Sequence, residues 1–262
     1  MIVKRILIIA FVVAALTAGC SSDDDEAADV TTVSASDITS TSTTDGDGTT
    51  STTGQTTTTG QTTTTAETTT TLAGEPFDGF ADDGDVLGVM GVAHDDVLNV
   101  RAGPGTDQAV VATAAPTAND VVATGRGRLL PASIWYQVTV DGRTGWVSIT
   151  FVGFVGATDD ATAEFVGDGD LITAETMTDL GLAVANGFAS EDPASRVVQS
   201  VAPSVGDLGE ITYDVIGLGD DAVAGYRLHV FGTEDEGGEG FVLKSIERTT
   251  FCSRGLSGEL CA

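Results

Sequence analysis

The stretch VLNVRAGPGTDQAVV, residues 97–111, decides the fold of the middle of the chain. It contains an alternating run, a Gly-Pro-Gly turn at residues 103–105, and a second run rich in β-forming residues. A phosphate-binding loop leads from a strand into a helix and, in its P-loop form, carries a lysine. Here Pro104 separates the glycines and a strand-like run follows, so the stretch predicts a turn between two strands.

The neighbouring residues extend this β pattern from about residue 85 to residue 156. In WYQVTVDGRTGWVSI, residues 135–149, two alternating runs flank Asp141 and Gly142, which predicts a β-hairpin with a tight turn. Short strands at this spacing, without a helical period, predict a small antiparallel barrel or sandwich.

Several motifs of this region resemble the bacterial SH3-like (SH3b) family. LNVRAGPG, WYQV and GRTGWV occur in the order typical of that family, over about 70 residues. The chain departs from the pattern at PTAND, residues 116–120, and at an inserted RLLPAS, residues 128–133. The resemblance implies an all-β SH3-like barrel over residues 85–156 that binds cell-wall peptidoglycan or its peptides in a groove with aromatic side chains.

The ligand-binding candidates of this domain are Arg101, Trp135, Tyr136 and Trp146. Trp135 and Tyr136 are adjacent in a strand and must face opposite ways, so one of them is expected to form a ligand platform. For Trp146 a place in the core is the stronger interpretation, with a ligand platform as the alternative.

The N-terminus, MIVKRILIIAFVVAALTAGC, predicts a lipoprotein signal peptide over residues 1–19. Lys4 and Arg5 precede an apolar run at residues 6–16, which is too short to span a membrane as a helix. The ending LTAGC resembles the lipobox of bacterial lipoproteins. That resemblance implies that Cys20 carries diacylglycerol, with fatty acids such as palmitate, and anchors the chain on the extracytoplasmic side of the cell membrane. An ordinary secretory signal with an incidental cysteine is the alternative.

Residues 20–84 predict a disordered linker between anchor and barrel. About half of residues 31–71 are threonine, and residues 20–84 include thirteen acidic and no basic side chains. Such a segment has too little apolar surface to offset the entropy of ordering.

The cysteines indicate one disulfide. If Cys20 is lipidated, Cys252 and Cys261 remain as a pair, which normally oxidises outside the cytoplasm. A metal site is the alternative, but two cysteines without nearby histidines fit it poorly.

Residues 157–262 predict an α+β domain with a C-terminal disulfide loop. An amphipathic helix is expected over residues 172–193, with Thr173 as its N-cap and Pro193 as its stop. A short second helix is possible at residues 195–202. Three strands are expected after it, at residues 210–218, 224–233 and 240–251.

The sequence contains no catalytic motif. Its two histidines, His94 and His229, lie in different predicted domains, and there is no nucleophile elbow, zinc-protease motif or P-loop. We therefore expect no enzyme, no cofactor and no metal. Paired acids of a glycoside hydrolase stay possible in so acidic a C-terminal domain.

The charge of the chain restricts its partners. A formal net charge of −28 excludes nucleic acid. Residues 85–156, with six acidic and four basic side chains, are the part least repelled by an anionic wall. We expect a lipid-anchored envelope protein that binds peptidoglycan. The alternatives are a wall-active hydrolase targeted by the SH3-like domain, and an envelope sensor or assembly subunit that binds a protein partner.

Overall fold

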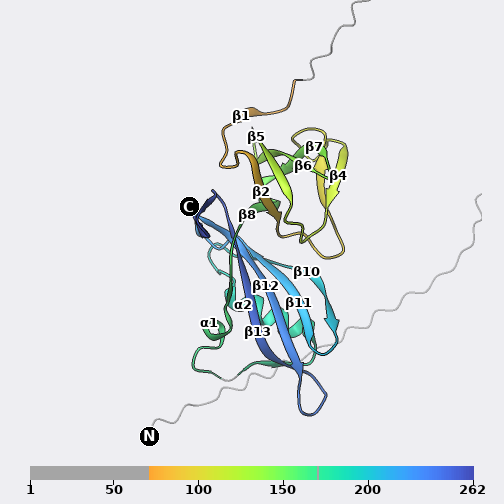
Figure 1. The fold of residues 1–262 in the computed structure, drawn as a ribbon, viewed down its shortest axis with the longest axis vertical. Coiled ribbons are helices and arrows are strands. Elements are labelled where there is room, and N and C mark those ends of the chain that lie inside the picture. Colours follow the sequence, from red (N-terminus) through yellow and green to blue (C-terminus); the bar gives the residue numbers. More distant parts are fainter. Residues whose placement is uncertain (1–70, 170) are drawn as a thin grey trace, which may run out of the picture. The chain divides into compact units, whose positions relative to one another are not determined.

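The computed structural model describes residues 71–169 and 171–262. The predicted signal peptide, Cys20 and most of the predicted linker lie outside the described residues. In the described part, antiparallel strands form a 13-stranded sheet, and a separate two-stranded sheet lies near the C-terminus (Figure 1). Within these same ranges, no helix is long and apolar enough to cross a membrane.

The first strands of the described part of the chain form the predicted barrel. Its elements are β1 (Glu75–Phe77), β2 (Asp83–Val89), β3 (Leu98–Arg101), β4 (Val110–Ala114), β5 (Val121–Leu130), β6 (Ser133–Val140), β7 (Arg143–Ser148) and the short 3₁₀ helix η1 (Ile149–Phe151). They pair in the order β2-β5-β6-β7-β3-β4, with β1 on β5. Alternate residues of these strands meet in one core, which includes the fully buried Val100, Val138 and Val147.

Local sequence explains the two turns that shape this barrel. Residues 97–111 form β3, a turn and the start of β4, as predicted, and Gly105 has φ +128° in that turn. The predicted hairpin is β6–β7. Asp141 and Gly142 have φ values of 50° and 73°, the pair of positive angles that a type I′ turn requires.

The ordered barrel begins earlier than the linker boundary predicted at residue 84. Glu75–Phe77 pairs with β5, with Glu75 opposite Leu129 and Phe77 opposite Gly127. Phe77 also packs against the barrel core. The last residues of the expected linker therefore have an apolar side chain to bury, unlike the threonine tract before them.

Strand β8 (Val152–Asp160) continues from the barrel into the second half of the chain. It pairs with β2 on one side and with β13 on the other. The remaining elements are α1 (Thr162–Val166), β9 (Thr173–Ala174), α2 (Met177–Phe188), β10 (Arg196–Val205), β11 (Gly209–Ile216), β12 (Val223–Glu234) and β13 (Phe241–Cys252). The three strands predicted after residue 209 are confirmed. Because β8 is shared, the C-terminal strands continue the barrel's sheet, and the α+β domain expected over residues 157–262 is not clearly separate from the barrel.

Helix α2 covers the C-terminal strands. Leu180 and Val184 are fully buried and share a core cluster with Ile211, Leu228 and Ile246. The helix is shorter than predicted, and its N-cap is Thr176 instead of Thr173. Thr173 is held in β9, opposite Val242, which keeps it out of the helix.

The short helix considered at residues 195–202 is wrong, because Arg196–Val205 is strand β10. This strand pairs with β11, with Arg196 opposite Ile216 and Val205 opposite Gly209. Three of its residues are β-branched valines before Pro203, which favours a strand over a helix. Here the pairing with β11 overrides the weak helical pattern.

The predicted cysteine pair is at disulfide distance in the structure. Cys252, at the end of β13, and Cys261 have Cα atoms 5.1 Å apart. They enclose the small hairpin of β14 (Leu256–Ser257) and β15 (Leu260–Cys261). The last strand of the main sheet is thus linked to the end of the chain.

Candidate functional site

The adjacent aromatic residues of β6 face opposite ways. Tyr136 belongs to the barrel core, and its hydroxyl accepts a hydrogen bond from the Phe80 backbone N–H at 3.1 Å. Burial raises the pKa of Tyr136, and the hydrogen bond from Phe80 partly offsets this effect. Trp135 is on the other face, where its Nε1 donates to Ser133 Oγ at 2.9 Å. Of the two, Trp135 is the one placed to meet a ligand.

The two tryptophans share the outer face of β6 and β7. Trp135 is opposite Arg128 of β5, and Gln137, two residues along β6, is opposite Trp146. Trp146 is in turn opposite Arg101 of β3. Only 4% of Trp135 and 2% of Trp146 is exposed, so both rings form the walls or floor of a pocket and not free platforms.

The first pocket, which we call the Trp135 pocket, has a volume of about 550 Å³. Trp135, Phe151 and Val97 supply apolar wall, and Arg101, Arg196 and Asp96 supply charge. The Nη1 of Arg101 donates to the Gln108 carbonyl at 2.8 Å, which orients that side chain. A pocket of this size with a few convergent polar groups is typical of a small-ligand site.

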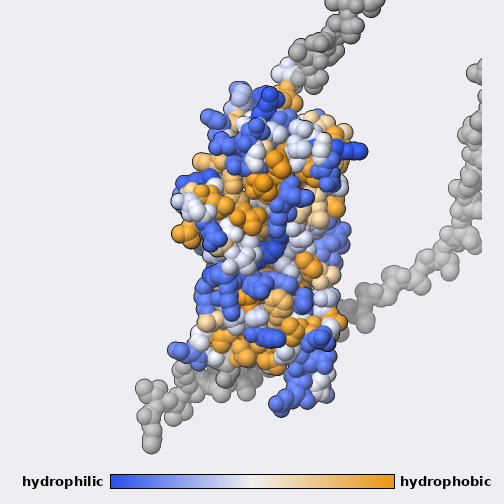
Figure 2. Space-filling view, viewed as in Figure 1, coloured by the Kyte–Doolittle hydropathy of each residue, from blue (hydrophilic) through white to orange (hydrophobic). Residues whose placement is uncertain are grey.

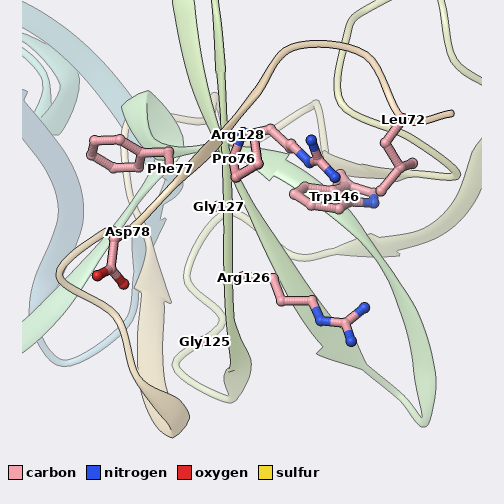
Figure 3. Close-up of a pocket in the computed structure, with 9 residues that line it drawn as sticks. All are labelled: Leu72, Pro76, Phe77, Asp78, Gly125, Arg126, Gly127, Arg128 and Trp146. Carbon is pink, nitrogen blue, oxygen red and sulfur yellow. The ribbon is translucent and has the colours of Figure 1, made fainter.

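The second pocket, which we call the Trp146 pocket, has a volume of about 460 Å³. Figure 3 shows Arg128 and Leu72 beside the ring of Trp146, while Arg126 extends away from it. The Nη1 of Arg128 donates to the Gly74 carbonyl at 3.1 Å. Residues just before β1 therefore cover Trp146 and leave less of its ring available to a ligand.

Arginines without an acidic partner gather at these two pockets. Arg227, Arg248 and Arg254 each pair with a carboxylate. Within residues 71–169 and 171–262, the five arginines with no carboxylate in ion-pair distance are Arg101, Arg126, Arg128, Arg143 and Arg196. Four of the five line a pocket. In a chain of net charge −28, this distribution favours an anionic ligand at both places.

The side of the molecule that Figure 2 shows has no large apolar patch that could bind a ligand in place of the two pockets. Hydrophobic and hydrophilic residues are intermixed there, over the barrel and over the C-terminal strands. A ligand on this side would meet small apolar areas bordered by polar groups.

Neither His94 nor His229 lines the Trp135 pocket or the Trp146 pocket. His229 is on β12, with Nε2 3.3 Å from Glu210, Nδ1 3.9 Å from Glu247, and its ring against Phe231. The backbone N–H of His94 donates to the Gln199 carbonyl. Across the part of the chain that the structure describes, no three His, Cys, Asp or Glu side chains are grouped so as to hold a metal ion.

The sequence did not indicate Arg196, Phe151 or Val97 as site residues. Arg196 is 61 positions from Trp135 and was assigned to a possible helix, so no local pattern joined the two. Phe151 follows the Gly-Trp-Val motif within the predicted barrel, and no local pattern marks it as a site residue. Only their common position on the Trp135 pocket reveals them.

Part of the barrel matches a known protein family. Residues 96–152 match the family model of the bacterial SH3 domain, a family often involved in cell-wall binding. The SH3-like interpretation is confirmed for that stretch, which includes Arg101, Trp135 and Trp146. Arg196 lies outside it. No match was found among curated proteins or among solved structures.

Proposed function

We propose that this protein is a lipid-anchored envelope protein on the extracytoplasmic side of the cell membrane, whose SH3-like domain binds cell-wall peptidoglycan or its peptides. The observation that carries the proposal is the Trp135 pocket. It combines an aromatic wall with two guanidinium groups, and most of its lining belongs to a bacterial SH3 domain.

The chemistry of the pocket suits the peptides of the wall. Such peptides carry free carboxylates and small apolar side chains. A guanidinium group binds a carboxylate through two parallel hydrogen bonds, and an indole supplies apolar contact with little loss of side-chain entropy. Arg101 and Trp135 offer both within one pocket.

The N-terminal features support the proposed anchor. A diacylglycerol on Cys20 would bury enough CH₂ groups for durable attachment. Because the barrel begins at Glu75, a linker of about 55 residues would span roughly 40 Å as a flexible coil and about 170 Å when fully extended. Incorporation of an alkyne-labelled palmitate into the wild-type chain, and its loss in Cys20→Ser, tests this part of the proposal.

Peptidoglycan binding is tested by sedimentation of the full-length chain in detergent with purified sacculi. Val97 is 40% exposed at the Trp135 pocket, whereas Val110 is 47% exposed on β4 and lines neither pocket. We expect Val97→Glu to weaken binding at least tenfold and Val110→Glu to leave it unchanged. If the wild-type chain stays in the supernatant, peptidoglycan binding is rejected and an envelope protein becomes the partner to seek.

We also propose that residues 157–262 act as a non-catalytic α+β part of the protein. The support is the fold itself: β8 pairs with β2 of the barrel and with β13, and α2 packs on the C-terminal strands in a core of their own. Incubation of the pure chain with sacculi should release no soluble fragments. Release of reducing sugar or free amine would instead favour the hydrolase.

A further inference from the structure

Arg196 brings the C-terminal half of the chain into the Trp135 pocket. It lies on β10, outside the stretch that matches the SH3 domain, and lines the pocket together with Val198. Its guanidinium carbon lies 5.3 Å from the centre of the Phe151 ring, so a cation–π contact holds the side chain over the pocket wall. Gly91 leaves room for it, because a Cβ there would collide with Arg196 Nη2.

Arg196 is one of the few basic side chains in the acidic C-terminal half of the chain. Residues 157–262 contain twenty acidic and five basic side chains. The other three arginines of this half, at positions 227, 248 and 254, are all paired with carboxylates. Arg196 has no carboxylate within ion-pair distance among the described residues, although acids are abundant. Its charge is therefore available to a ligand.

The pocket as a whole has an excess of positive charge. Arg101 and Arg196 face a single acid, Asp96, whose Oδ1 already accepts a hydrogen bond from the Val97 N–H at 2.7 Å. The rest of the lining carries no charge, and it includes the apolar side chains of Trp135, Phe151 and Val198 as well as the polar side chains of Asn99, Thr106, Ser133 and Ser148. Charge complementarity thus calls for one anionic group next to a small apolar one.

We infer that the occupant is a short peptide with a free C-terminal carboxylate, and that Arg196 is a specificity-determining residue of the site. This inference rests on the proposed function and adds the ligand class to it. The terminal carboxylate binds the guanidinium groups of Arg101 and Arg196. The last side chain, small and apolar, lies against Trp135 and Phe151. The C-terminal half of the chain thereby selects what the SH3-like domain binds.

The test uses the full-length chain in detergent and tryptophan fluorescence as the binding signal. The probes are N-acetyl-alanyl-alanine as the free acid and the same peptide as its C-terminal amide. The variants are Arg196→Gln, Arg196→Lys and the matched control Arg143→Gln. Arg143 also has no acidic partner among the residues that the structure describes, but it lines neither pocket and donates to the Val111 carbonyl.

We expect the wild-type chain to bind the acid at least tenfold more tightly than the amide. Arg196→Gln should remove most of this preference and leave the affinity for the amide unchanged. A variant that only disturbed the structure of the pocket would weaken the binding of both peptides. Arg196→Lys should restore part of the preference, because it keeps the charge but not the planar, two-point geometry. Arg143→Gln should behave as the wild type.

Sacculus sedimentation of the same preparations separates this inference from the proposed function. If sacculi bind but acid and amide are equivalent, or Arg196→Gln matches Arg143→Gln, the inference is overturned and the proposed function stands. If the acid binds through Arg196 but sacculi do not, the site stands and the wall function fails. Polyphosphate serves as a third, non-peptide anionic probe. If it binds and neither peptide does, the ligand is not a peptide and the inference is overturned.

Discussion

Asp214 and Arg227 form a two-point ion pair, with Arg227 Nε 2.8 Å from Asp214 Oδ1 and Nη2 2.9 Å from Oδ2. Asp214 is fully buried. Both side chains of the pair also form hydrogen bonds with backbone groups of the barrel. Asp214 Oδ2 accepts a hydrogen bond from the Gly91 N–H at 2.8 Å. Arg227 Nη2 donates to the Val89 carbonyl at 2.9 Å and to the Pro116 carbonyl at 3.0 Å. Gly91 lines the Trp135 pocket, so this pair supports one of its walls.

Substitution of Arg227 should strongly lower the stability of the folded protein. Arg227→Met leaves the Asp214 carboxylate buried without its counter-ion, and we expect the free energy of unfolding to fall by about 3–5 kcal/mol. Urea denaturation measures the change. In the control Arg254→Met, which breaks the exposed pair with Asp221, the loss should stay below about 1 kcal/mol. Equal losses in the two variants would contradict the role given to the buried pair.

The start of helix α2 depends on Thr176. Its Oγ1 accepts from the Asp179 N–H at 3.1 Å and donates to Asp179 Oδ2 at 2.7 Å. Thr176→Ala should destabilise the protein by about 1 kcal/mol because an N–H of the first turn loses its partner. Thr173→Ala is the matched control, and thermal unfolding of the two variants compares them. A larger effect at Thr173 would restore it as the cap.

The link between Cys252 and Cys261 should stabilise the end of the sheet. The two residues are nine positions apart, and a loop of that length is worth about 2–3 kcal/mol in the chain-entropy account. Reduction with dithiothreitol should lower the urea midpoint of the wild-type chain accordingly. Cys261→Ser should show the lower midpoint with or without the reductant. A midpoint that reduction leaves unchanged in the wild type would show that the loop adds nothing.

Tyr136 should make the barrel sensitive to alkali. Burial raises the pKa of its phenol in the folded state above the value of about 10 expected in the unfolded chain. The neutral phenol therefore contributes stability that is complete below about pH 10 and is lost as the pH rises through the folded pKa. Tyr136→Phe should flatten the fall of stability above about pH 10.

A pH series of urea denaturation curves tests this effect. At neutral pH, Tyr136→Phe should cost about 1 kcal/mol, because the Phe80 N–H loses its acceptor. Part of the alkaline slope should persist in the variant, since burial and the charge of Asp179 also raise the pKa of Tyr213. Parallel stability curves for wild type and variant would exclude Tyr136 as the titrating group.

The barrel was predictable because its signals are local. The alternation in residues 97–101 places Val100 inside and Arg101 toward the surface. Asp141 and Gly142 accept positive φ angles, so they define the β6–β7 turn and with it the register that pairs Gln137 with Trp146. Trp135 and Tyr136 could be assigned to opposite faces because adjacent residues of a strand alternate between its two faces.

The C-terminal half was less predictable because its choices depend on distant partners. Residues 196–205 form a strand through pairing with β11, and Thr173 is kept from capping the helix by its pairing with β13. The early start of the barrel at Glu75 likewise depends on β5, some fifty residues later in the sequence.

The sequence by itself determined the strand-turn-strand pattern of the SH3-like domain, the cysteine pair and three of the C-terminal strands, because side-chain alternation and turn chemistry act over a few residues. Only the tertiary structure decided which face of β6 opens into a pocket and that Arg196 completes it. Those outcomes follow from burial and strand register between residues far apart in the chain, where no local pattern carries the information.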